Sequence, residues 1–278
     1  MQGAESLNKC GRDDKVAILF VFAVCLCAST IGGICGIGGG VIIKPTLDLF
    51  GLASVSTISF LSGCTVLSMS CYSVGKAMLA GDSKVDTKTG TPLALGAAVG
   101  GIVGQNLFRT VRSLFANQNA VGAVQAGCLA LITVGTLLYT LKKAGIRTKH
   151  VRGILPCLVI GLLLGIMSSF LGIGGGPINL VVLGYCFSMD TKVAAQNSLY
   201  IILFSQIANL LTTLITRSVP AFDILTLALM VCGGIGGGMI GRKLNKKLDN
   251  KAVDKLFIAL MAVIIGISLW NVWQYSGV

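Results

Sequence analysis

Residues 33–40 read GICGIGGG and residues 170–177 read FLGIGGGP, so two long apolar runs end in nearly the same glycine cluster. Glycine allows a backbone to leave the helical conformation and lets another group approach it closely. Inside a hydrocarbon core, a non-helical segment is tolerated only where protein buries it or where it lines a wet cavity. The two clusters therefore predict paired helix breaks within a membrane-embedded bundle.

The rest of the sequence is apolar enough to embed in a bilayer. Of 278 residues, 54% are hydrophobic and 12% are charged, whereas soluble domains carry about 25% charged residues. A helix of about 20 apolar residues crosses the hydrocarbon core. We therefore expect an all-α polytopic protein of the cell membrane, with about eight transmembrane helices and a short re-entrant or half-spanning segment after each glycine cluster. The expected spans are Val16–Cys35, Val55–Gly75, Thr91–Phe108, Val121–Leu141, Ile154–Leu171, Val193–Ile215, Ile224–Gly241 and Val253–Trp273.

The formal net charge of +12 does not indicate a nucleic-acid partner, because the 22 Lys and Arg lie mostly between the apolar runs. Basic residues at such places orient helices and meet anionic lipid headgroups. The ten cysteines contain no CxxC pair, and His150 is the only histidine, so no metal-binding pattern is present. No nucleophile–base pair is evident. The sequence predicts no enzyme and no cofactor or metal.

The two halves of the chain resemble each other. Residues 36–40 match residues 172–176 at an offset of 136, and VGGIVGQNL at 99–107 matches GGGMIGRKL at 236–244 at an offset of 137. Between these landmarks, STISF at 56–60 falls near AQNSL at 195–199. Two homologous repeats are typical of secondary transporters. The expected organisation is a polar tail over 1–15, repeats over 16–141 and 153–278, and a basic linker over 142–152.

The orientation of the repeats depends on the short segments Val41–Phe50 and Ile178–Phe187. If both dip in and return, the repeats are parallel, and basic residues divide 12 inside against 9 outside. If both cross, the repeats invert and the division becomes 15 against 6. The positive-inside rule favours inverted repeats, although ten helical residues reach only about 15 Å, half of the core.

The breaks are candidates for an anion site. Pro45 and Pro177 suit the early turns of new short helices. A helix N-terminus presents free N–H groups and partial positive charge, so two such ends facing each other near the midplane would bind an anion. The alternative is close helix packing through small residues four apart, which we favour for Gly96, Gly100 and Gly104 and for Gly233, Gly237 and Gly241. The candidate glycines are Gly36, Gly38, Gly39, Gly40, Gly172, Gly174, Gly175 and Gly176.

Polar residues inside apolar segments extend this candidate site. Polar side chains at membrane depth face a cavity or another helix. The alternative role for amides and hydroxyls is interhelical hydrogen bonding, and for Lys44 it is reaching the headgroups. The first candidates are Asn179, Asn197, Ser198, Ser59 and Lys44, and the second are Gln206 and Asn209. By contrast, we expect Gln105, Asn106, Arg242 and Lys243 at the membrane interface.

The GIGGG and GIGGGP clusters, the basic central linker and the NSL and ISF stretches together resemble the TauE/SafE family of sulfite and organosulfonate exporters. The resemblance covers nearly the whole chain. It implies a permease of the bacterial cytoplasmic membrane that moves small sulfur oxyanions outward. The first copy departs from the family pattern, because Lys44 and apolar residues separate Gly40 from Pro45, and because STISF is poor in the usual small residues.

We therefore expect a secondary transporter, an exporter of a small anion such as sulfite or an organosulfonate. An anion channel, a transporter of another small solute, a membrane enzyme and a structural subunit are the alternatives. No Asp or Glu lies in the middle of a long span, which favours passive transport driven by the membrane potential. Assembly into a homo-oligomer is left open.

Overall fold

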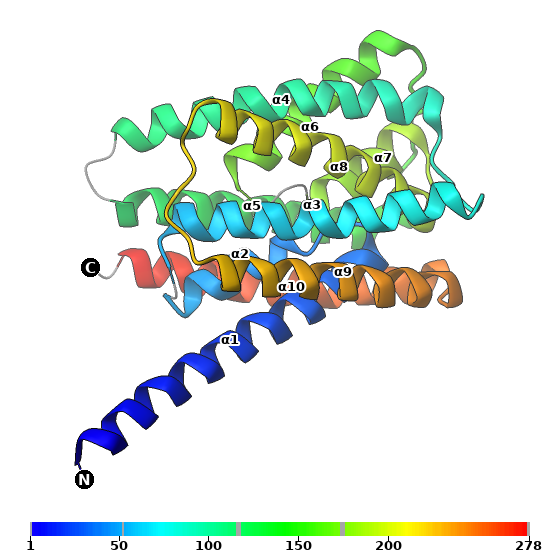
Figure 1. Ribbon diagram of the computed structural model, residues 1–278. Coiled ribbons are helices and arrows are strands. Elements are labelled where there is room, and N and C mark those ends of the chain that lie inside the picture. The colour runs from blue at the N-terminus through cyan, green and yellow to red at the C-terminus, as the bar shows by residue number, and fades with distance from the viewer. Residues whose placement is uncertain (1, 52, 115–117, 173–175, 277–278) are drawn as a thin grey trace.

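A computed structural model of the chain describes residues 2–51, 53–114, 118–172 and 176–276, and these ranges are helical, without β-strands (Figure 1). The prediction of an all-α protein is confirmed for them. The helices are α1 (Gln2–Cys35), α2 (Gly40–Leu49), α3 (Val55–Leu79), α4 (Thr87–Leu114), α5 (Gln118–Lys142), α6 (Ile154–Phe170), α7 (Pro177–Phe187), α8 (Thr191–Ile215), α9 (Ile224–Lys247) and α10 (Asn250–Ser276), with a 3-10 turn, η1 (Lys143–Gly145), after α5.

Seven helices among the described residues are long and apolar enough to cross a membrane: α1, α3, α4, α5, α8, α9 and α10. The expected eighth span, Ile154–Leu171, forms α6, which has 17 residues and reaches about 26 Å. Large apolar side chains on the outer faces, such as Leu131, Leu155 and Trp273, are 68–75% exposed, as expected of groups that meet lipid. The chain is a polytopic membrane protein.

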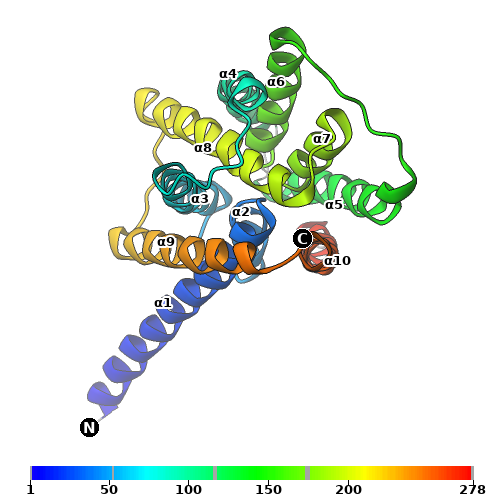
Figure 2. The same cartoon turned by 90° about the vertical axis from the view of Figure 1, so that its right-hand side faces the viewer.

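Two sets of helices pack around a shared centre. α4 packs on α6 and α8, while α9 packs on α1 and α3. α5 and α10 contact each other, and each also contacts one short helix, α7 and α2 respectively. α3 and α8 meet in the centre of the bundle (Figure 2). The N-terminal part of α1 extends away from the bundle in both views (Figures 1 and 2).

The glycine-rich stretches of α4 and α9 serve close packing, as predicted. A Cβ at Gly96 or Gly100 would collide with the carbonyl oxygens of Leu158 and Leu162 on α6. On α9, a Cβ at Gly241 would collide with α1 in the same way. Small residues at four-residue spacing let helix backbones approach this closely in a membrane.

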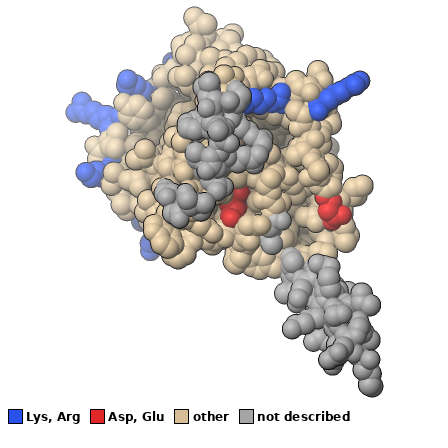
Figure 3. Space-filling view, turned by 90° about the vertical axis from the view of Figure 1, so that its left-hand side faces the viewer, with Lys and Arg blue, Asp and Glu red and all other residues tan. Residues whose placement is uncertain are grey.

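Both ends of the chain lie on one side of the bundle, at the left of Figure 1. The connection between α8 and α9 lies on this side, where Thr57 Oγ1 donates to the carbonyl oxygen of Ala221 at 3.2 Å. We call this side, with the starts of α3 and α9 and the end of α10, the termini face. Figure 3 shows it, with Lys and Arg side chains at its periphery.

The opposite side, which we call the linker face, carries the α3–α4 connection (80–86), the linker (143–153) and the starts of α8 and α10. Ser188 Oγ donates to the carbonyl oxygen of Lys149 at 3.0 Å here, and Arg242 pairs with Asp82 at 2.5 Å. In Figure 1, α1 runs toward this face and α2 turns back, whereas α6 runs away from it and α7 returns.

Candidate functional site

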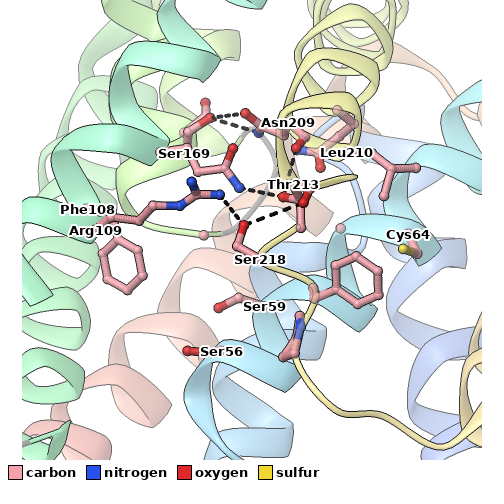
Figure 4. Close-up of a pocket in the computed structure, with 17 residues that line it drawn as sticks. Ser56, Ser59, Cys64, Phe108, Arg109, Ser169, Asn209, Leu210, Thr213 and Ser218 are labelled. Carbon is pink, nitrogen blue, oxygen red and sulfur yellow. Dashed lines mark hydrogen bonds between the residues drawn. The ribbon is translucent and has the colours of Figure 1, made fainter. Parts of the chain in front are cut away.

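A cavity of about 160 Å³ opens near the termini face, between α3, α4, α6, α8 and the connection that follows α8 (Figure 4). Ten of the seventeen described lining residues have polar side chains, although all four helices are apolar overall. The described residues that line it are Ser56, Ser59, Phe60, Gly63, Cys64, Gln105, Phe108, Arg109, Ser168, Ser169, Gly172, Gln206, Asn209, Leu210, Thr213, Ser218 and Pro220.

The polar lining is held together by hydrogen bonds that cross between helices. Asn209 Nδ2 on α8 donates to Ser169 Oγ at the end of α6, at 2.8 Å. Gln105 Nε2 on α4 donates to Thr213 Oγ1 on α8, at 2.6 Å. These bonds, drawn in Figure 4, tie three helices to one wall of the cavity.

The charge around the cavity favours an anion. Arg109, at the end of α4, donates to Ser218 Oγ at 2.5 Å and to Thr216 Oγ1 at 3.0 Å, so its guanidinium is held beside the opening. The described lining residues include no carboxylate. A fixed cation and neutral donors bind a small oxyanion, since hydrogen bonds between ionised partners are stronger than neutral ones.

Gly172 lets a second cationic group, the Lys44 ammonium, approach the same cavity. Its φ of +64° is in the left-handed region that favours glycine. A Cβ at this position would lie 2.9 Å from Lys44 Nζ and 3.0 Å from Ser59 Oγ. Lys44 is 4% exposed, and its ammonium therefore lies directly behind the glycine that lines the cavity.

Lys44 also holds the end of α6 in place. Its Nζ donates to the carbonyl oxygen of Leu171 at 2.9 Å and to Gln125 Oε1 at 2.8 Å. Gln125 Nε2 donates in turn to the carbonyl oxygen of Phe170 at 2.7 Å. The last carbonyls of a helix lack partners within the helix and carry partial negative charge, so a buried ammonium stabilises them. The alternative that Lys44 reaches the headgroups does not fit this position.

Two buried polar atoms of the lining have no hydrogen-bond partner among the described residues, Ser59 Oγ and Gln105 Oε1. A buried hydroxyl without a partner costs free energy. Ser59 is thus available to donate to a molecule in the cavity. Of the predicted site residues, Ser59, Gly172, Gln206 and Asn209 line the cavity, and Lys44 lies behind it.

The first glycine cluster breaks the chain between α1 and α2 elsewhere. Gly36 and Gly38 have φ of +77° and +71°, and a Cβ at Gly36 would collide with the backbone of Ala195 near the start of α8. A Cβ at Gly39 would lie 2.9 Å from Ser29 Oγ, and Gly40 is the first residue of α2. None of these four glycines belongs to the described lining of the cavity.

The second cluster is described in part. Gly174 and Gly175 lie outside the described residues. Gly176 precedes α7, and Pro177 is the first residue of that helix, as predicted. Asn179 is 1% exposed, and its Oδ1 has no hydrogen-bond partner among the described residues. The facing of two helix N-termini near the midplane stays a prediction.

The expected position of Pro45 is wrong. α2 already begins at Gly40, so Pro45 lies inside this helix at its sixth position. The proline ring removes one backbone N–H donor from the helix. The carbonyl oxygen of Pro45 accepts a hydrogen bond from Asn271 Nδ2 at 3.1 Å.

Asn197 and Ser198 lie outside the described lining of the cavity. Asn197 is fully buried near the linker face, where its Oδ1 accepts from the backbone N–H of Asp86 at 3.2 Å. Its Nδ2 donates to the carbonyl oxygens of Val193 and Lys84 at 2.9 and 3.3 Å. The amide therefore fastens the α3–α4 connection to α8, whereas Ser198 Oγ is buried without a partner among the described residues.

Sequence reasoning missed Arg109, Gln105 and Ser169 as site residues. Gln105 was expected at the membrane interface, yet it lines the cavity together with Arg109. The two side chains are four residues apart, so they share one face of α4. An arginine and an amide on one helical face at the end of a glycine-rich span would have been the signal.

Residues 21–269 match the family described as Sulfite exporter TauE/SafE. No curated protein and no solved structure matches the chain.

Proposed function

Because the chain belongs to the TauE/SafE sulfite exporter family, we propose that it carries a small anion such as sulfite or an organosulfonate through the cavity between α3, α4, α6 and α8. The observation that carries this proposal is the lining: Arg109 at the opening, Lys44 behind Gly172, and no carboxylate among the described lining residues. The volume of about 160 Å³ suits an ion better than the larger organic ligands of pockets above roughly 300 Å³.

The lining suits the oxygens of such an anion. Ser59 Oγ is free to donate, and Gln206 brings an amide to the same space from α8. The left-handed Gly172 permits close approach at the end of α6. Neutral donors hold an ion weakly enough for release, with Arg109 supplying attraction at the opening.

We further propose that the two halves are inverted repeats. The contacts of α1 with α9, of α3 with α9 and of α2 with α10 have counterparts in those of α6 with α4, of α8 with α4 and of α7 with α5. The opposite directions of α1 and α6 in Figure 1 support inversion. The positive-inside rule then puts the linker face, which carries the larger number of basic residues, in the cytoplasm. The cavity would open outward.

A smaller cavity of about 40 Å³ on the linker face is the counterpart of the anion cavity. The offsets between the halves, of which 136 also separates the bounds of α3 and α8, relate Gly33 to Ser169, Ser73 to Asn209 and Ala195 to Ser59. They also relate Arg242 to Gln105 and Lys246 to Arg109. The first member of each of these pairs lines the smaller cavity, and the second lines the larger one.

An ion cluster closes this smaller cavity. Asp82, on the α3–α4 connection, pairs with Arg242 at 2.5 Å and also with Lys246, both at the end of α9. In a carrier with inverted repeats, opening on one face goes with closure on the other. The present conformation therefore represents the state open to the termini face, with the Asp82 cluster as the closed gate.

The test is flux in proteoliposomes with sulfite and a small organosulfonate as substrates, beside Arg109→Gln and the matched control Arg152→Gln in the exposed linker. We expect saturable flux that unlabelled substrate on the opposite side accelerates, with a Km raised at least fivefold in Arg109→Gln and unchanged in Arg152→Gln. Flux that neither saturates nor shows counterflow would indicate a channel. No flux of either anion by folded protein would refute the proposal.

A further inference from the structure

A half-buried carboxylate, that of Asp48, lies one helical turn from Lys44. Asp48 shares α2 with Lys44, and both line a cavity of about 20 Å³ between α2, α5 and α10. Ser268 and Asn271 of α10 line the same cavity. Asp48 Oδ1, Ser268 Oγ and Asn271 Oδ1 are all buried there without a hydrogen-bond partner among the described residues.

The described groups around these three oxygens make no hydrogen bond to them. An ionised carboxylate and an amide oxygen only accept hydrogen bonds, and one serine hydroxyl supplies a single donor. Asn271 Nδ2 gives one of its two hydrogen atoms to the Pro45 carbonyl oxygen, and Lys44 Nζ gives two of its three to Gln125 and Leu171. Neither group donates to Asp48 Oδ1. Buried acceptors left in this state are costly. A proton on Asp48 turns one acceptor into a donor.

A metal cation fits this place less well than a proton. The cavity of about 20 Å³ has room for about one water molecule, and the Lys44 ammonium lines it as well. A second fixed positive charge at such short range is strongly repelled in a medium of low dielectric. A proton adds the missing donor without an additional ion in the cavity.

We propose that Asp48 binds a proton that is transported together with the anion. The link is Lys44, whose ammonium bonds the Leu171 carbonyl oxygen and lies behind Gly172 in the anion cavity. While Asp48 is ionised, it neutralises Lys44. Once Asp48 is protonated, the Lys44 charge is uncompensated and attracts an anion to the Gly172 side. Proton and anion binding therefore strengthen each other reciprocally.

The remaining surroundings of Asp48 leave Lys44 as its main partner. Tyr275 on α10 also interacts electrostatically with Asp48. The α5 residues at this cavity, Gly122 and Gln125 among them, are uncharged, and no described residue of α1 or α3 lines it.

This inference rests on the proposed transport of an anion and changes its energetics. A monoanion that moves with one proton carries no net charge, so a pH gradient drives it toward the alkaline side and a membrane potential does not. Where the cytoplasm is the more alkaline side, this drives uptake, the reverse of the expected export. The sequence-based expectation of passive, potential-driven transport is the opposite case.

The experiment uses the full chain in proteoliposomes with an organosulfonate as the substrate. This substrate stays a monoanion across the working pH range, so any change of flux with pH arises from the protein and not from titration of the substrate. We expect accumulation of about tenfold for a gradient of one pH unit, and no response to a potential imposed alone. Asp48→Asn should keep the anion flux, lose the accumulation driven by the pH gradient and become responsive to potential. The control Asp190→Asn, which removes a carboxylate without a capping hydrogen bond on the linker face, should behave as the wild type.

If sulfonate flux changes with the imposed potential and does not change with the pH gradient, the proposed proton site is refuted. The proposed anion transport is still supported in that case. Absence of flux overturns the transporter, and the proton site is then decided by infrared spectroscopy of the folded protein. Loss of a neutral carboxylic-acid band in Asp48→Asn, at a pH where the wild type shows it, supports the site. An unchanged spectrum refutes it.

Discussion

Lys44 and Leu171 are 127 residues apart in the chain, yet the Lys44 ammonium donates to the Leu171 carbonyl oxygen at 2.9 Å inside the bundle. The bond joins α2, which follows the first glycine cluster, to the end of α6, where the second cluster begins. One buried side chain therefore stabilises the helix break that lines the proposed anion cavity, and it places a positive charge beside that break.

Lys44→Met should lower the stability of the folded protein. The substitution leaves the Leu171 carbonyl oxygen and Gln125 Oε1 without their donor, and breaking a buried charged partnership on one side costs about 3 kcal/mol. Thermal unfolding in detergent measures the loss. Lys88→Met, at an exposed position on α4, is the matched control and should change the unfolding temperature little. Equal unfolding temperatures in both variants would contradict the proposed role of Lys44.

Gly172→Ala should strongly reduce anion transport. The left-handed φ of +64° strains an alanine, and the added Cβ would lie 3.0 Å from Ser59 Oγ and 2.9 Å from Lys44 Nζ. The expected loss is at least tenfold in flux per folded molecule. Gly135→Ala, in α5 with open space around its Cβ position, should transport normally because alanine is favoured in a helix. Normal flux in Gly172→Ala would exclude close approach of the anion at this position.

Asp82→Asn should expose the smaller cavity on the linker face. The substitution removes the partner of Arg242 and Lys246, and the energetic bias toward the present closed state falls accordingly. The readout is the labelling rate of Ser73→Cys by a water-soluble thiol reagent, on a background without the native cysteines. We expect labelling at least threefold faster with Asp82→Asn and no change with the control Asp86→Asn. An equal labelling rate with and without Asp82→Asn would show that the Asp82 ion cluster does not control access to the smaller cavity.

The same gate should respond to acid. The hydrogen bond from Lys246, with the charges of Arg242 and Lys246, lowers the pKa of Asp82 below its ordinary value. A carboxylate with a depressed pKa contributes stability above the ordinary aspartate value of about 3.9 and loses it as the pH falls through the lower, folded-state pKa. The labelling rate of Ser73→Cys, divided at each pH by the rate measured with Asp82→Asn to remove the effect of pH on the thiol itself, should stay low from pH 8 to about 4 and increase only below that. Acceleration near pH 6 would point to another titrating group.

Much of the architecture follows from local sequence properties. Apolar runs of sufficient length predicted the spanning helices, since hydrocarbon forces backbone hydrogen bonds to close within one segment. Small residues four apart on α4 and α9 predicted close packing, because their spacing alone puts them on one face. The glycine clusters predicted interruptions, and positive φ angles at Gly36, Gly38 and Gly172 are the local reason.

The identity of the site residues depended on how four helices meet. Asn197 and Asn209 lie on the same helix and look alike in sequence, yet Asn197 fastens a connection at the linker face and Asn209 lines the anion cavity. Which face each amide reaches is set by its depth along α8 and by the neighbours there. No local pattern contains that information, because it arises only when helices distant in the chain pack together.

The sequence by itself therefore determined a helical membrane protein with two glycine breaks, because hydrophobicity and backbone freedom are properties of single segments. Only the tertiary structure decided that Arg109, Ser59 and Gly172 share a cavity, that Lys44 stabilises the end of α6, and that Asp48 is left with an unpartnered oxygen. Cavities, buried charges and unsatisfied acceptors are created by packing between helices, and their energies depend on distances that no single segment sets.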